Sequence, residues 1–397
     1  MESINVLSLC DGMSCGQIAL TQLCVPINHY YASEIDKSAI EQTQHNFPNT
    51  IQLGNIEKWR EWNINFKSID LILAGTPCQG FSFAGKQLAF DDPRSRLFFV
   101  FVDILNHIRK LNPDVKFLLE NVNMKKSHLE VISRYTGVFP VRINSNLVSA
   151  QNRDRWYWTN VKTKEVGLFG EIYSDIPQPK DRGILLRDIL ENDVAEKYYL
   201  SDKTINYYQQ NSAKMKEKGN GFSFQPTDGI KKANSVTTKE VGRMENNFIY
   251  IKQLGRGFNK GGVHQDKTPT LTKNSWERNN ILIPEATKKG YVEIKFGECF
   301  DSENIKSNTR RGRLMAYKSN CLMSNGNHFM RYTHDYRIRR LTPTECAKLQ
   351  TIPDWYEWIV SDTQIYKQCG NGWTVEVIKH ILSQWDLVNE LVLTEAI

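Results

Sequence analysis

Residue types suited to covalent chemistry lie at three places along the chain, each next to an apolar run. Cys78 follows the first run and a proline that fixes its local backbone. Glu120 ends the second run, and Arg153 and Arg155 follow the third. A lone cysteine is more often a small buried side chain than a nucleophile. Because a thiol, a carboxyl group and two guanidinium groups at neighbouring strand ends could meet in one crevice, the spacing favours a nucleophilic site.

Longer stretches around these residues carry a family pattern. They read Gly-Thr-Pro-Cys-Gln-Gly-Phe-Ser at 75–82, Glu-Asn-Val at 120–122 and Gln-Asn-Arg-Asp-Arg at 151–155. In this order they resemble the cytosine-C5 DNA methyltransferase family. The resemblance covers roughly residues 1–160 and 336–397, and the full set of motifs is far more specific than any one of them.

The resemblance implies covalent catalysis on a cytosine flipped out of the duplex. Cys78 would add to C6 of the base as a thiolate, which prepares C5 to accept a methyl group. Glu120 would act as the acid at the N3/N4 edge. Arg155 would bind O2, and Arg153 would lie near Glu120 and a backbone phosphate. A structural salt bridge is the alternative role for the arginines, and no residue is identified as the base that removes the C5 proton.

A glycine-containing turn at residues 9–16 separates the first expected strand from the first expected helix. Backbone N–H groups and a helix N-terminus face a ligand at such a turn. Glu34 follows about 20 residues later, at the place of a carboxylate that holds a ribose diol; an ordinary exposed glutamate is the alternative. The resemblance implies S-adenosylmethionine as the methyl donor and S-adenosylhomocysteine as the product. The residues that it assigns to the cofactor are Cys10, Asp11, Gly12, Met13, Glu34, Ile35, Asn55, Ile56, Leu97, Asn371 and Trp373.

This turn departs from the usual family form, Phe-x-Gly-x-Gly-Gly. Cys10 replaces the phenylalanine, and Ser14 and Cys15 replace the later glycines. The resulting form, together with Trp373, is closest in style to the catalytic domain of the animal de novo DNA methyltransferases. Asn55 stands where the family usually has aspartate, and its side-chain carbonyl oxygen can accept from the adenine amine in the same way.

Apolar runs that alternate with amphipathic stretches predict the elements that position these residues. Strands are expected at 5–9, 29–33, 69–74 and 116–119, and helices at 17–23, 37–46, 94–111 and 375–393. A further helix is expected near Pro343, capped by Thr342 or Thr344. This order predicts an α/β fold with a Rossmann-like, mostly parallel class I methyltransferase sheet.

Residues 161–335 differ from the rest because they are polar, rich in Asn, Thr, Lys and Gly, and poor in long helical periodicity. They predict a mostly β or irregular target-recognition domain, inserted between catalytic parts at 1–160 and 336–397. This segment holds 29 Lys and Arg against 21 Asp and Glu, whereas the remainder holds 22 against 23. Such an excess indicates a nucleic-acid surface, with a solvated basic surface as an equal alternative. The candidates for base or phosphate contacts are Arg243, Arg256, Lys260, Lys273, Arg278, Arg310, Arg311 and Arg313.

Composition excludes several classes of protein. The 397 residues are 40% hydrophobic and 24% charged, as in an ordinary globular protein. No apolar run is long enough to predict a membrane span. The eight cysteines form no Cys-x-x-Cys pair and do not cluster with the eight histidines. Reduced thiols without a bound metal are therefore expected.

We therefore predict an S-adenosylmethionine-dependent DNA cytosine-C5 methyltransferase that modifies a specific sequence in double-stranded DNA. A monomer in the cytoplasm of a prokaryotic or phage-infected cell is expected, with a role in protecting DNA from a restriction endonuclease that acts on the same site. Two alternatives stay open: an RNA cytosine-C5 methyltransferase, and a DNA-binding relative that has lost catalysis. The presence of Cys78, Glu120, Arg153 and Arg155 argues against the second alternative.

Overall fold

The chain forms two compact units in a computed structural model. One comprises Met1–Ile189, Lys232–Arg243 and Pro343–Ile397, and the other Leu190–Lys231 and Met244–Thr342. The limits of the target-recognition domain, at 161 and 335, stay a prediction. The structure describes residues 3–76, 96–168, 170–217, 226, 232–235, 248–252, 281–284, 291–294, 299–300, 314–315 and 336–388.

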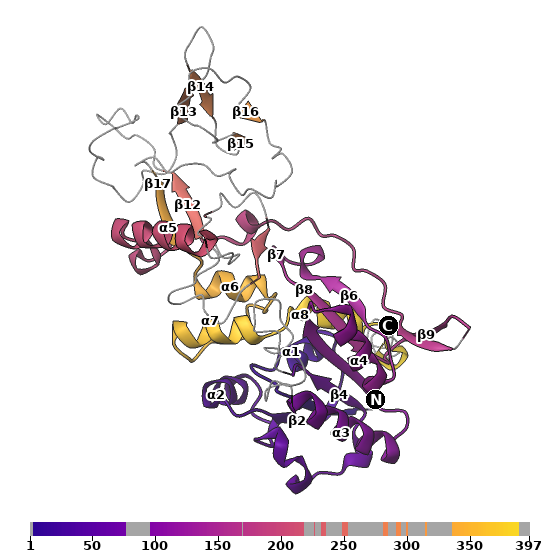
Figure 1. The fold of residues 1–397 in the computed structure, drawn as a ribbon. Coiled ribbons are helices and arrows are strands. Elements are labelled where there is room, and N and C mark those ends of the chain that lie inside the picture. Colours follow the sequence, from indigo (N-terminus) through magenta and orange to yellow (C-terminus); the bar gives the residue numbers. More distant parts are fainter. Residues whose placement is uncertain are drawn as a thin grey trace, which may run out of the picture. The chain divides into compact units, whose positions relative to one another are not determined.

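The first unit is built on a seven-stranded sheet with the order β3-β2-β1-β4-β5-β8-β6 (Figure 1). Neighbouring strands from β3 to β5 are parallel, whereas β8 is antiparallel to both β5 and β6. The strands are β1 (Ile4–Leu9), β2 (Ile27–Ser33), β3 (Ile51–Gln52), β4 (Leu71–Ala74), β5 (Lys116–Val122), β6 (Val141–Asn144) and β8 (Asp154–Thr159). The predicted mostly parallel α/β sheet is confirmed.

Helices follow most strands of this sheet. The α-helices are α1 (Cys15–Gln22), α2 (Lys37–Asn46), α3 (Arg96–Leu111), α4 (Lys126–Thr136), α6 (Pro343–Leu349), α7 (Asp362–Asn371) and α8 (Val375–Leu382). The 3-10 helices are η1 (Ile56–Glu61), η2 (Phe66–Ser68), η5 (Ser145–Leu147) and η6 (Leu186–Ile189). Two short pairs complete the unit: β7 (Gln151–Asn152) with β11 (Ala233–Asn234), and β9 (Thr163–Val166) with β10 (Glu171–Ser174).

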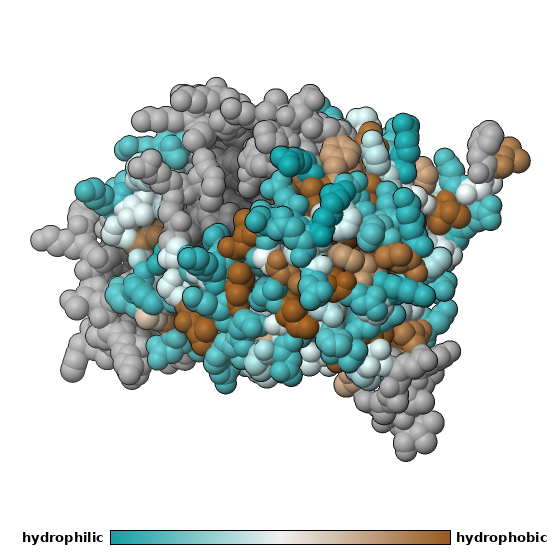
Figure 2. All heavy atoms as spheres, turned by 90° about the horizontal axis from the view of Figure 1, so that it is seen from below, coloured by the Kyte–Doolittle hydropathy of each residue, from teal (hydrophilic) through white to brown (hydrophobic). Residues whose placement is uncertain are grey.

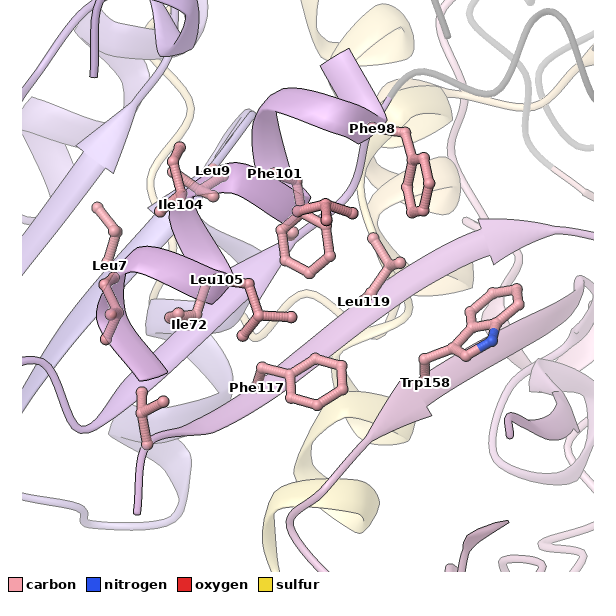
Figure 3. Close-up of a cluster of buried hydrophobic side chains, with 14 of the residues drawn as sticks. Leu7, Leu9, Ile72, Phe98, Phe101, Ile104, Leu105, Phe117, Leu119 and Trp158 are labelled. Atoms are coloured by element: carbon pink, nitrogen blue, oxygen red, sulfur yellow. The ribbon is translucent and has the colours of Figure 1, made fainter. Parts of the chain in front are cut away.

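One face of the sheet packs against α3 (Figure 3). Residues of a strand point alternately to the two faces of the sheet. The register places Leu7 beside Ile72 and Ile72 beside Phe117, so all three point to the face that α3 covers. The α3 residues that fill the layer recur at helical spacing, as their apolar pattern predicts: Phe98, Phe101, Ile104, Leu105 and Ile108. The core therefore forms where every second residue of the strands packs against residues of α3 that recur with the helical period of 3.6.

The opposite face packs against α1, which lies close to β4. A Cβ atom built on Gly16 would lie 2.3 Å from Leu73 Cδ1 and 3.2 Å from the Tyr30 hydroxyl. Leu73 neighbours Ile72 in the strand and so points away from α3. A glycine at this position lets the helix after the cofactor turn approach the sheet.

Two element boundaries in this unit differ from the predictions by more than two residues. The strand expected to end at Leu119 continues to Val122, because antiparallel β8 supplies pairing partners for the last three residues. The helix expected over 375–393 ends at Leu382. After Leu382 the backbone hydrogen bonds change from the i→i−4 spacing of an α-helix to i→i−3 spacing, for example from the Trp385 N–H to the Leu382 carbonyl. The side chain of Trp385 is buried in this turn.

The second unit contains a helix that the sequence analysis missed, α5 (Asp202–Glu217). Its polar composition hides any apolar stripe, but Ser201 accepts from the Thr204 N–H and marks its start. Besides the 3-10 helix η7 (Glu196–Tyr198), the other described elements are antiparallel strand pairs, in agreement with a mostly β insertion. They are β12 (Phe248–Lys252) with β17 (Tyr336–Arg340), β13 (Ile281–Pro284) with β14 (Tyr291–Ile294), and β15 (Cys299–Phe300) with β16 (Leu314–Met315).

Hydrophobic side chains are scattered among hydrophilic ones on the face shown in Figure 2. No helix in the described part of the chain is long and apolar enough to cross a membrane. The same residues hold no group of three or more His, Cys, Asp and Glu side chains that could bind a metal ion.

The close approach at Gly16 gives a first prediction. Gly16→Ala should lower the free energy of unfolding by about 1–3 kcal/mol because the new methyl group overpacks a core site next to Leu73. Denaturant unfolding measures this change. The cost should shrink when Leu73→Ala removes the opposing methyl groups, so a double-mutant cycle should give clear coupling. Additive effects of the two substitutions would contradict the steric explanation.

Candidate active site

The sheet topology explains why the predicted catalytic side chains meet. The carboxyl ends of parallel β1, β4 and β5 lie at one edge, and antiparallel β8 begins at that same edge, where Val122 pairs with Arg155. The chain leaves β4 there through Gly75 and Thr76. Cys78 lies outside the described residues, two positions further on. The topology thus brings Glu120, Arg155 and the segment that leads to Cys78 to one edge.

Glu120 and Arg155 form an ion pair. The Arg155 Nε atom lies 2.9 Å from Glu120 Oε1, with the two side chains 16% and 12% exposed. The Nε–H does not align as a hydrogen bond to the carboxylate. Nη1 donates to the Asp154 carbonyl at 2.9 Å, and within the described part of the chain no acceptor engages Nη2. The guanidinium is therefore fixed on one side and retains donors for a ligand.

Arg153 is engaged differently from Arg155. It is 4% exposed, and its Nη2 donates to the carbonyls of Gly372 at 2.8 Å and Gly370 at 3.3 Å. Both carbonyls flank Asn371, at the end of α7. Arg153 thus holds the segment that carries a predicted cofactor residue.

Gln151 anchors the same motif in a buried hydrogen-bond network. Its amide donates to the Leu349 carbonyl at 2.6 Å and to Gln350 Oε1 at 3.0 Å. Thr374 donates to Gln350 Oε1 at 3.0 Å and shares a hydrogen bond with Ser145 at 2.8 Å. All of these polar side chains are at most 1% exposed. The network joins β7 to the segment that includes Trp373.

The predicted cofactor turn has an unusual backbone. Cys10, Gly12 and Ser14 have φ values of 56°, 60° and 62°. Such values are rare for non-glycine residues and cluster at functional sites. Ser14 donates a short hydrogen bond to Asp11 Oδ2, and the Tyr30 hydroxyl donates to Asp11 Oδ1 at 2.9 Å. The Asp11 carboxylate thus supports the turn from within.

The environment of Asp11 changes its ionisation. Although part of the residue remains accessible, protein surrounds its carboxyl group. Burial raises the pKa of Asp11 to about 6, against the lowering effect of the hydrogen bonds from Ser14 and Tyr30. The ionised form at neutral pH is therefore less favourable than in water.

Glu34 lies directly after β2 and bridges two loops. Its Oε2 accepts from the Gly12 N–H at 2.8 Å, and its Oε1 accepts from the N–H groups of Ile35 at 2.7 Å and Asp36 at 2.9 Å. A carboxylate oxygen can accept two hydrogen bonds. Oε2 therefore retains one acceptor site for a ligand hydroxyl next to the cofactor turn.

The other predicted cofactor residues fall into two groups. Ile35 is 72% exposed, an apolar surface beside Glu34 that suits an aromatic ring. Asn55 Oδ1 already accepts from the Glu57 N–H at 2.9 Å and has room for one further donor. Asn371 is exposed at the end of α7, and Cys10 is partly buried. The second group consists of side chains that are packed more deeply, those of Met13, Ile56, Leu97 and Trp373.

Gly75 and Trp373 bring the ends of β4 and α7 together. A Cβ atom on Gly75 would lie 2.9 Å from Trp373 Nε1, so a glycine is needed for this contact. Trp373 therefore lies beside the segment that leads to Cys78. Sequence reasoning missed the supporting residues Tyr30 and Tyr356; the Tyr356 hydroxyl donates to the Met13 carbonyl at 3.0 Å. No motif marks either tyrosine.

Burial limits which described cysteines could act as nucleophiles. It raises the pKa of Cys10 and of Cys15 to about 12 and the pKa of Cys369 still further. These thiols stay protonated at neutral pH, whereas the nucleophile must be a thiolate. Cys78 is therefore favoured over the three buried thiols of the same unit.

Comparisons with known proteins agree with this geometry. The family model of C-5 cytosine-specific DNA methylases matches residues 4–386. Type II methyltransferase M.HgiCI of Herpetosiphon aurantiacus is 29% identical over 422 residues, covering 96% of this chain and 97% of that protein. Type II methyltransferase M.BanI of Aneurinibacillus aneurinilyticus is 30% identical over 414 residues, covering 91% and 90%.

Solved structures share the fold. The Dnmt2 methyltransferase of S. pombe aligns with a TM-score of 0.57 at 17% identity, over 98% of this chain and 99% of that one. The Spodoptera frugiperda DNMT2 structure aligns with a TM-score of 0.52 at 19% identity, over 96% and 99%. The predicted class I methyltransferase fold is confirmed.

The raised pKa of Asp11 predicts a pH dependence of stability. Its carboxyl group should stabilise the fold fully below its unfolded pKa, and this contribution should be lost as pH rises through about 6. The difference in unfolding free energy between the native protein and Asp11→Asn should therefore fall between about pH 4 and pH 6. Denaturant titrations at several pH values measure this difference.

Asp36→Asn provides a control of opposite sign. Burial acts to raise the pKa of the Asp36 carboxyl group. The hydrogen bond from Lys367 and its positive charge outweigh this effect and hold the pKa below its usual value. Its stabilising contribution should be present at higher pH and lost as pH falls through the lowered pKa. Equal pH profiles for the two variants would contradict the assigned environments.

Proposed function

Because the chain belongs to the family of C-5 cytosine-specific DNA methylases, it is a DNA (cytosine-5) methyltransferase, and we propose that Cys78, Glu120 and Arg155 carry out the reaction on a flipped-out cytosine. The observation that supports this assignment is the Glu120–Arg155 ion pair at the sheet edge where the Cys78 segment leaves β4. In this mechanism Cys78 attacks C6 of the base. Glu120 protonates the N3 edge, and Arg155 binds O2 through its remaining donors.

S-adenosylmethionine is the proposed methyl donor. It supplies an electrophilic methyl group on a sulfonium centre. The residues fit it: Glu34 keeps an acceptor site for a ribose hydroxyl, and exposed Ile35 offers a surface for adenine. A Cβ atom on Gly12 would contact nothing within 4 Å, so the turn leaves open space where the cofactor would bind. Asn371 and Trp373 complete the proposed site on the other side.

The proposed reaction passes through a covalent adduct between Cys78 and the base. Attack by the Cys78 sulfur would make the S–C6 bond and shift electrons to C5 while Glu120 gives a proton to N3. As C5 bonds the methyl carbon, the bond from that carbon to the sulfonium sulfur would break, and S-adenosylhomocysteine would leave with the electron pair. Loss of the C5 proton to water would then break the S–C6 bond, return the N3 proton to Glu120, and restore the aromatic ring and the Cys78 thiolate. Arg153 donates to the carbonyls of Gly370 and Gly372, and these contacts support a proposed contribution to positioning Asn371.

The basic segment 161–335 is the proposed recognition domain for a specific sequence in double-stranded DNA. The residues proposed to contact bases or phosphates, such as Arg243 and Arg278, lie outside the described residues. Relatives of the type II class favour a role in a restriction-modification system. We therefore propose a monomer that acts in the cytoplasm of a prokaryotic or phage-infected cell and protects sites cut by a partner endonuclease.

Conversion sequencing at base resolution tests the proposed function. DNA from cells that express the native protein should contain protected cytosines in one fixed context, and DNA from cells that express Cys78→Ser should not. Equal protection in both samples would exclude Cys78 as the nucleophile. Absence of protection in both, with methyl transfer to RNA by the purified protein, would favour the RNA alternative.

A mechanism-based trap tests the roles of Glu120 and Arg155. In the presence of S-adenosylmethionine, duplex DNA with 5-fluorocytosine at the target should form a covalent complex that survives denaturation, because after methyl transfer C5 carries fluorine and has no proton to lose. Glu120→Gln should slow its formation by a factor on the order of 10²–10⁴, the usual worth of a positioned acid. Arg155→Met should also slow it, and Lys379→Gln, which removes an ion pair within α8, should not. An unchanged rate in Glu120→Gln would remove the acid role.

A further inference from the structure

The proposed cofactor site has two halves that come from distant parts of the chain. Glu34 and Ile35 follow β2, whereas Asn371 and Trp373 follow or end α7. A single ligand can contact both halves only if α7 is held in place relative to the Glu34 loop. Direct contacts between these two regions therefore matter for binding.

An ion pair makes this connection. Lys367 Nζ lies 2.6 Å from Asp36 Oδ2, with side chains 44% and 28% exposed. Lys367 and Asn371 are four positions apart in α7 and so lie on the same face of that helix. When Asp36 holds Lys367 in place, the position of Asn371 along the axis of α7 and its direction around that axis are therefore held as well.

Asp36 links Lys367 to the Glu34 carboxylate. Its Oδ1 accepts from the Ser38 N–H at 3.1 Å and caps α2, which leaves Oδ2 for Lys367. Its backbone N–H donates to Glu34 Oε1 at 2.9 Å. One residue thus carries the helix cap, the ion pair and a bond that orients the proposed ribose ligand Glu34.

We propose that Lys367 is a positioning residue for cofactor binding, which couples the Glu34 loop to Asn371 through Asp36. The inference depends on the proposed S-adenosylmethionine site. The contact contributes only modestly to overall stability, because partly exposed ion pairs are weak. Its effect should therefore appear in cofactor affinity in addition to the small pH-dependent change in unfolding free energy expected for Asp36→Asn.

Calorimetric titration of the full-length protein with S-adenosylhomocysteine tests the proposal. Lys367→Gln should weaken binding about two- to fivefold, the range set by one partly exposed ion pair. Asp36→Asn should weaken it similarly, because asparagine caps α2 as well as aspartate does but lacks the charge. With S-adenosylmethionine as substrate, KM should rise while kcat stays unchanged.

Lys379→Gln is the matched control. Lys379 Nζ lies 2.7 Å from Glu376 Oε1, with side chains 24% and 26% exposed, in α8. This variant loses a comparable ion pair and should bind the ligand like the native protein. The affinity loss in Lys367→Gln should also shrink between about 0.1 M and 1 M salt, because salt screens the native pair.

The outcomes separate this inference from the proposed function. Failure of the native protein to bind S-adenosylhomocysteine would remove the cofactor site itself. Normal binding by both Lys367→Gln and Asp36→Asn would overturn the positioning role and leave the site intact. An equal loss in Lys379→Gln, or a loss that does not change with salt, would also overturn it, since either result indicates a general structural effect.

Discussion

The catalytic unit depends on a buried hydrogen-bond network that joins residues 198 positions apart, Gln151 and Leu349. A buried amide or hydroxyl group without a partner costs about 1–3 kcal/mol. Gln151, Gln350 and Thr374 satisfy one another only when β7 and the C-terminal segment are both in place. The network therefore requires the chain, which leaves this unit after η6, to return to it, and so a long insertion is compatible with one core.

This constraint also arranges the chemistry. Gln151, Arg153 and Arg155 lie within five consecutive residues but engage three different neighbours. Gln151 binds the C-terminal segment, Arg153 holds the carbonyls that flank Asn371, and Arg155 meets Glu120 on β5. A change in the network would therefore displace both the Asn371 segment and the Glu120–Arg155 pair, the two sides of the proposed site. Structural and catalytic roles of this motif cannot be separated by position in the sequence.

Sequence patterns predicted the fold wherever one local signal decided it. The apolar spacing in α3 gave the core face, and alternating strands and helices gave the parallel sheet. They failed where a distant partner decided the structure: β8 lengthens β5, and burial of Trp385 ends α8. The polar helix α5 lacked an apolar stripe. For the proposed site, motifs predicted Glu120 and Arg155, which form an ion pair, whereas the contacts of Tyr30, Tyr356 and Lys367 follow from no linear spacing.

The cofactor turn shows how the fold tolerates departures from the usual glycine pattern. Cys10 and Ser14 adopt left-handed backbone conformations that side chains disfavour. The Ser14 hydroxyl binds Asp11, which the Tyr30 hydroxyl also engages, so the side chain that strains the backbone also supplies a compensating bond. A glycine at 14 would relieve the strain but leave Asp11 with one fewer donor in a poorly solvated place. Backbone strain at residue 14 is therefore offset by a carboxylate that is held in place within the predicted cofactor turn.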